Sequence, residues 1–155
     1  MIQRVQSLYL LLTTVFSVLF LKGSIIKFID ESNNSLFINF GGINRILAGG
    51  GAEQIEKLIP LSVLLSLVPV LSFITLFFYK KRKSQLRLAT GLICIVMIQI
   101  LIIVYYSYYV IHNFNAEMLP GINLILPVLM LICSYLAYRG IKKDEDLVRS
   151  YDRLR

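Results

Sequence analysis

Residues 88–111 read LATGLICIVMIQILIIVYYSYYVI, a run of 24 residues without Asp, Glu, Lys, Arg or His. A helix of about 20 apolar residues crosses the hydrocarbon core of a bilayer, which is about 30 Å thick. A helix is the expected conformation, because every backbone polar group in lipid must find its partner within the same segment. The stretch therefore predicts a transmembrane helix.

Three further uncharged runs occupy residues 5–21, 58–79 and 119–138. The whole chain is 57% hydrophobic and 16% charged, whereas soluble domains average about 45–50% and about 25%. The first run follows Arg4 as a signal peptide would, but Lys22-Gly23-Ser24 lacks a cleavage-site pattern, so we expect a retained anchor. The sequence predicts an all-α integral membrane protein, a four-helix transmembrane bundle forming one domain over residues 1–155.

The basic residues predict the orientation of these spans. With the N-terminus inside, twelve Lys and Arg residues fall in residues 1–4, the loop 80–87 and the tail 139–155, and four fall in the outer loops 22–57 and 112–118. Cytoplasmic segments carry the excess of Lys and Arg, so both termini are predicted to be cytoplasmic. Six of these residues are expected to contact lipid headgroups: Lys80, Lys81, Arg82, Lys83, Lys142 and Lys143.

The outer loop 22–57 is long enough to fold. Two runs rich in β-branched and aromatic residues flank an Asn/Ser cluster between Ile25 and Phe40, which predicts a β-hairpin. The glycines at 41–42 and 49–51 are typical of a flexible linker. From Ala52 onward we expect a short amphipathic lead-in to the second span.

The sequence predicts no catalytic, metal-binding or cofactor site, and we expect the protein not to be an enzyme. The single histidine is His112, and Cys94 and Cys133 lie within apolar runs without a CxxC pattern. Gln99 is the most conspicuous polar residue in the spans, and we expect it to hydrogen-bond across helices. Its expected partners are Ser17, Ser66, Ser72 or Thr75.

The tail 139–155 contains no proline, so we expect the fourth helix to continue into water. Leu147, Val148, Tyr151 and Leu154 fall at i, i+1, i+4 and i+7, which places them on one stripe. One interpretation is a helix that docks a cytoplasmic protein partner. The other is a helix end that lies on the lipid headgroups. Acidic residues interleave with the basic ones, so no nucleic-acid partner is expected.

Both ends of the chain resemble a known family. The opening MIQRVQSLYLLL (residues 1–12), the closing RGIKKDEDLVRS (139–150) and DRLR (152–155) resemble an uncharacterised family of four-span membrane proteins from Bacteroidota, which carries a domain-of-unknown-function label. The resemblance implies a bacterial inner-membrane protein. It brings no activity, ligand or catalytic residue.

Two functions are compatible with these features. The first is a non-catalytic accessory, scaffold or subunit protein of a larger inner-membrane complex, with membrane lipids and proteins as partners. The alternative is a small uncoupled transporter or channel-like protein for a neutral or apolar solute. Ion-coupled transport is disfavoured, because such pathways use ionisable residues within the spans, and the four predicted spans contain none.

Overall fold

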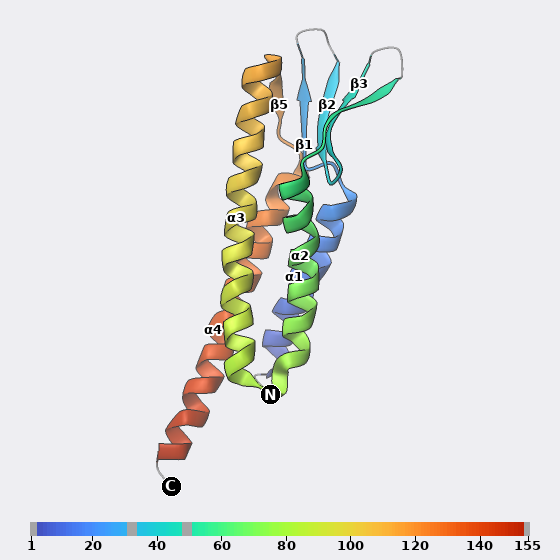
Figure 1. Cartoon of the computed structure of the whole chain (residues 1–155). Helices are drawn as coiled ribbons and strands as arrows, with labels where there is room; N and C mark the ends of the chain where they lie inside the picture. Colours follow the sequence, from blue (N-terminus) through green and yellow to red (C-terminus); the bar gives the residue numbers. More distant parts are fainter. Residues whose placement is uncertain (1–2, 31–33, 48–50, 154–155) are drawn as a thin grey trace.

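The computed structural model of the chain describes residues 3–30, 34–47 and 51–153. These residues form four long helices, α1 (Gln3–Lys22), α2 (Ile59–Phe77), α3 (Arg82–Phe114) and α4 (Ile125–Arg153). Two 3₁₀ turns, η1 (Phe78–Lys80) and η2 (Ile122–Leu124), precede α3 and α4. The helices pack side by side as a bundle with a β-sheet at one end and both chain ends at the other (Figure 1).

Each of these four helices is long and apolar enough to cross a membrane. Large apolar side chains point outward from the bundle along its length, among them Val63, Phe73, Leu101, Val104 and Ile132. Extensive apolar surface of this kind is unusual on a soluble monomer. The described structure therefore matches the predicted bundle of helices suited to a bilayer.

The helix ends differ from the predicted span ends. α3 begins at Arg82, six residues before the apolar run, because a helix continues into water wherever its residues permit. α4 begins only at Ile125, so Pro127 lies in its first turn, where backbone N–H groups have no intrahelical acceptor and proline is well tolerated. The expected continuation of the fourth helix is confirmed, since α4 runs through Gly140 to Arg153.

The sheet has the strand order β4-β3-β2-β1-β5 among the described residues, and all its neighbours pair antiparallel. Its strands are β1 (Ile26–Ile29), β2 (Ser35–Asn39), β3 (Gly42–Ile46), β4 (Ala52–Glu56) and β5 (Glu117–Leu119). The predicted hairpin is confirmed as β1 and β2. The predicted glycine linker is wrong where β3 lies, and the predicted lead-in from Ala52 is strand β4.

Gly41 and Gly42 belong to a tight turn and not to a linker. Asn39 pairs with Gly42, so only Phe40 and Gly41 connect β2 to β3. Gly42 has a φ of 136°, a conformation that residues with a side chain rarely adopt. A Cβ atom at this position would overlap the backbone oxygen of Glu56, so the absence of a side chain lets β3 approach the end of β4.

The sheet and the bundle share one hydrophobic core. Phe28, Leu36 and Ile43 from one sheet face join the same buried cluster as Phe20 and Leu61 from the helices. Polar contacts reinforce this junction. The amide of Asn123 donates to the backbone oxygen of Ser24 at 2.7 Å, and the Ser62 hydroxyl donates to the backbone oxygen of Phe40. The sheet is therefore a packed extension of the bundle.

Candidate functional site

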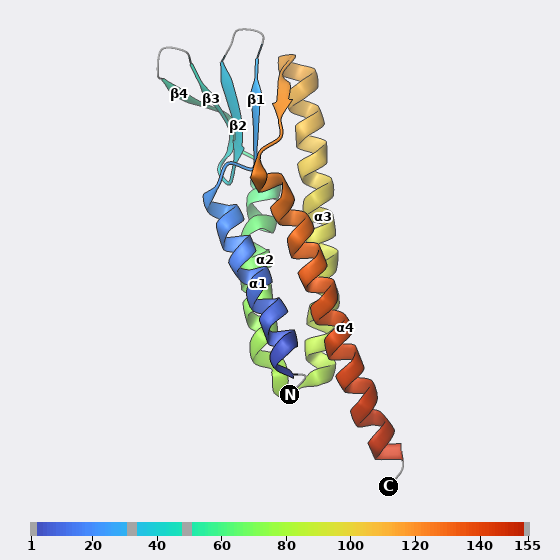
Figure 2. The ribbon, with the colours of Figure 1, turned by 180° about the vertical axis from the view of Figure 1, so that it is seen from behind.

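The candidate site is the part of α4 that extends beyond the other helices. Ala137, Ile141 and Asp144 are still buried against the bundle, and they follow the helical spacing of a packed face. The C-terminal part of α4 continues past the end of the bundle, as the two opposed views show (Figures 1 and 2). Asp144 is the last buried residue among the described side chains of α4. We refer to residues 145–153 as the α4 arm.

A buried carboxylate secures the base of the α4 arm. The side chain of Asp144 is 9% exposed, and its Oδ2 accepts a hydrogen bond from Nε2 of Gln6 on α1 at 2.8 Å. Gly140 lies one turn earlier, and a Cβ there would be 2.7 Å from Cγ of Gln6. Gly140 thus allows α1 and α4 to approach closely enough for the Gln6–Asp144 hydrogen bond, which we call the clasp.

Arg82 at the start of α3 makes a second hydrogen bond to Asp144. Its Nη1 donates to the backbone oxygen of Asp144 at 3.2 Å. A charged donor makes a stronger hydrogen bond than a neutral one. Helices α1, α3 and α4 therefore meet at Asp144, and the arm begins from a fixed base.

The structure describes only some of the predicted docking residues. Leu147 and Val148 lie on the α4 arm with 44% and 41% of their surface exposed. Tyr151 lies on the described backbone of α4, but its side chain falls outside the described part, as does the whole of Leu154. A groove of about 520 Å³ runs beside the start of the arm and is lined by Arg139, Lys142, Lys143, Asp146 and Leu147.

The basic residues predicted to contact headgroups gather at the same end of the bundle. Lys81 is exposed between η1 and α3, Lys83 is exposed in the first turn of α3, and Lys142 and Lys143 are exposed on α4. Arg82 differs from them, because it is half-buried and donates to α4. Lys80 ends η1, and its side chain lies outside the described part.

Gln99 faces the interior of the bundle and is 1% exposed, but its Oε1 has no hydrogen-bond partner among the described residues. The hydroxyls expected to meet it bond elsewhere. Ser17, Ser66 and Thr75 donate to backbone oxygens of their own helices, and Ser72 donates to the backbone oxygen of Leu10. Thr14 donates to Ser72 at 3.0 Å, which is a hydrogen bond between α1 and α2. The interhelical bond of Gln99 stays a prediction.

The comparison with known families matches residues 2–154 to the family described as Domain of unknown function (DUF4293). The chain belongs to this family. No curated protein matches the chain. The match covers the described bundle, the sheet and the α4 arm together, so this member of DUF4293 carries the arm as part of the family domain.

Sequence reasoning missed the clasp. Gln6 lies in an apolar run, and Asp144 lies in the acidic stretch Asp144-Glu145-Asp146 of a tail expected to be solvated. The sequence signal that Gln6 and Asp144 share is their helical spacing from a buried residue. Gln6 precedes the buried Leu10 by four residues, and Asp144 follows the buried Ile141 by three, so both continue a core-facing stripe.

Proposed function

We propose that this DUF4293 protein is a non-catalytic accessory or scaffold subunit of a larger complex in the bacterial inner membrane. The α4 arm is the surface that binds its partner at the cytoplasmic face. The observation that carries the proposal is the change along α4 from buried Asp144 to exposed Leu147 and Val148, directly beyond a fixed base. Burying an aliphatic side chain completely contributes about 1.5–3 kcal/mol, so two such residues supply useful binding energy.

Two acidic residues at the start of the arm favour a protein partner over the lipid surface, although Arg139, Lys142 and Lys143 line the adjacent groove. Glu145 and Asp146 directly precede Leu147 in the chain, and Asp146 is exposed. Anionic headgroups repel carboxylates, and they attract polybasic segments. An amphipathic helix that binds a membrane surface carries Lys and Arg on its polar face. The start of the arm is acidic, which suits a basic or mixed protein surface better.

The proposed orientation places the chain ends and the arm in the cytoplasm. Twelve Lys and Arg residues belong to segments at that end of the bundle, and four belong to segments at the sheet end. The excess of basic residues supports a cytoplasmic position for the end that holds them. The sheet then lies on the outer side of the membrane.

The packed axis of the bundle disfavours the alternative of a solute path. Leu61, Val68, Leu92, Val96 and Met130 from three helices are all fully buried. Protein interiors of this kind are close-packed, with few voids larger than a water molecule. The accessory role is therefore the better supported of the two.

The orientation predicts where reporter fusions are active. A reporter that works only outside the cytoplasm should be active when inserted near Asn34 or Asn115, both at the sheet end. It should be silent at Ser84 or after Arg155. A reporter that works only in the cytoplasm provides the control, and it should give the reverse pattern at all four positions. Activity of the outside reporter at Ser84 would overturn the orientation.

The docking role predicts that Leu147→Asp with Val148→Asp releases the partner. Both positions are exposed, so the bundle should remain folded while two apolar contacts are replaced by charges. The measurement is quantitative mass spectrometry of proteins that co-purify with the full chain after mild detergent extraction. At least one stoichiometric partner of the wild type should fall about tenfold or more in the double variant.

The matched control for this experiment is Leu147→Met with Val148→Ile, which keeps both side chains apolar. It should retain the partner at the wild-type level. An identical partner set for the wild type and the double Asp variant would refute docking through the arm.

A further inference from the structure

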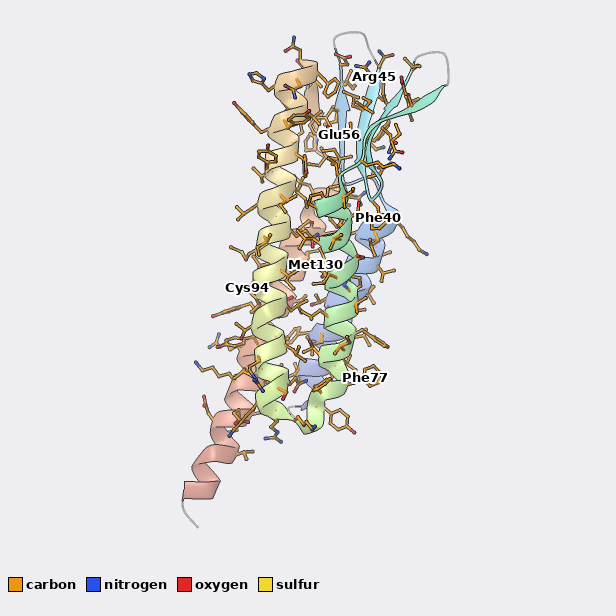
Figure 3. All side chains as sticks on the ribbon, viewed as in Figure 1. Phe40, Arg45, Glu56, Phe77, Cys94 and Met130 are labelled. Carbon is orange, nitrogen blue, oxygen red and sulfur yellow. The ribbon has the colours of Figure 1, made fainter. Side chains whose placement is uncertain are left out.

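A second groove lies at the opposite end of the molecule, where α1 meets the sheet. It has a volume of about 440 Å³, and its lining includes Lys22, Lys27, Phe37, Asn39, Phe40 and Asn44. Phe40 marks its position at the base of the sheet, beside the end of α1 (Figure 3). We propose that this groove binds the headgroup phosphate of an anionic phospholipid. The proposal rests on the helices crossing a membrane, and it is independent of the α4 arm.

One side of the groove is a corner of fixed geometry. The chain leaves α1 through residues 22–24, where the backbone oxygen of Ser24 accepts the hydrogen bond from Asn123. Gly23 packs closely on the same side chain, because a Cβ there would be 2.8 Å from Nδ2 of Asn123. The position of Lys22 relative to the sheet is thereby set by a contact from the distant η2 segment.

The other side of the groove is the sheet face that points away from the core. Lys27, Phe37 and Asn44 are directly opposite one another on β1, β2 and β3, and they form one row across the strands. Nζ of Lys27 lies 5.5 Å from the centre of the Phe37 ring, which is within the range of a cation–π contact. This contact holds the ammonium group above the sheet, on the side where the groove opens.

The charge of the groove suits an anion. Its described lining contains two lysines and no acid. Asp30, which directly follows β1, accepts a hydrogen bond from Arg45 at 3.0 Å. The C-terminal end of a helix carries partial negative charge, and Lys22 in the last turn of α1 offsets it. Lys27 therefore supplies the net positive charge of the site, with the side-chain amides of Asn39 and Asn44 as further polar groups.

The location of the groove favours a lipid over a soluble anion. Lys22 ends α1 directly after an apolar run that is long enough to cross the membrane. The preceding turn of α1 exposes Val18 and Leu19. A phospholipid places its phosphate at the level where the hydrocarbon ends, and its acyl chains then lie against such apolar residues. A soluble anion would use the lysines alone.

The test uses the full-length protein, purified in detergent and stripped of lipid. Phosphatidylglycerol or phosphatidylcholine is then titrated in, and bound lipid is counted by native mass spectrometry. Phosphatidylglycerol should bind tightly to one site of the wild type. Lys22→Gln and Lys27→Gln should each weaken that binding about fivefold, and the double variant about thirtyfold, if each lysine contributes as basic residues do near anionic lipids. Lys27→Arg should retain binding.

Lys57→Gln is the matched control, because Lys57 is exposed at the same end of the bundle but does not line the groove. It should bind phosphatidylglycerol like the wild type. Circular dichroism should show the same fold for all variants, since both groove lysines are exposed. Three results would each overturn the proposal: equal weakening by Lys57→Gln, equal binding of phosphatidylcholine, or displacement of the lipid by inorganic phosphate at the same concentration.

Discussion

Replacing Gly42 with alanine should open the sheet between β3 and β4 while the helices stay folded. The φ of 136° is strained for any residue with a side chain, at a cost of about 1–3 kcal/mol. The new Cβ would also overlap the backbone of Glu56, which cannot move without breaking the β3–β4 pairing. We expect a total loss of about 4 kcal/mol or more in the stability of this part of the sheet, at the upper end of single-residue effects.

Hydrogen–deuterium exchange of the purified protein measures this effect locally. Amides of residues 43–46 and 52–56 should exchange much faster in Gly42→Ala, and those of α3 should not change. Gly41→Ala is the matched control. Gly41 is exposed, and the nearest group to its added Cβ is the Gln54 amide at 3.7 Å. Equal acceleration in both variants would show that Gly42 has no special role.

The helices could be predicted from sequence because the signal that specifies them is local. A run such as residues 88–111 exceeds the length needed to cross a bilayer and carries no charge, so few alternatives compete. The ends of α3 and α4 were harder to place. Hydropathy marks where lipid would end, whereas a helix ends where its backbone hydrogen bonding stops. In α3 this end is at Asn115, whose φ of 44° is left-handed.

The sheet was predicted only in part, because much of its pairing is non-local. β1 and β2 are joined by a short turn and read as a hairpin, but β5 pairs with β1 from beyond two helices, with Phe28 opposite Met118. A strand of three residues has almost no sequence signature. Composition also gave a wrong prediction of a linker at Gly41 and Gly42, because glycine is common both in tight turns and in flexible linkers.

The candidate site, like the sheet, was predictable only in part. The stripe of Leu147 and Val148 follows from helical spacing, and the structure places both on an exposed part of α4. The clasp joins residues 138 positions apart, and no local pattern pairs an amide in one span with one acid among the four in the tail. The arm was therefore visible from the sequence, but the contact that fixes its base was not.

Replacing Asp144 with leucine should lower the free energy of unfolding by about 2–3 kcal/mol. The substitution removes a hydrogen bond to a charged group, worth about 1.5–3 kcal/mol, and leaves the buried amide of Gln6 without its acceptor. The measurement is reversible unfolding in detergent, followed by circular dichroism. Asp146→Leu is the matched control, because Asp146 is exposed two residues further along α4, and such surface changes stay within about 0.5 kcal/mol.

The double variant Gln6→Leu with Asp144→Leu separates the bond from the burial. Replacing both partners of a buried polar pair with apolar groups is often nearly neutral, so the double variant should be more stable than Asp144→Leu alone. Equal losses for Asp144→Leu and Asp146→Leu would contradict the clasp.

The clasp also fixes the base of the α4 arm, so Asp144→Leu should reduce partner co-purification although Leu147 and Val148 are unchanged. Reduced stability with undiminished co-purification would mean that the arm binds its partner without needing a fixed base.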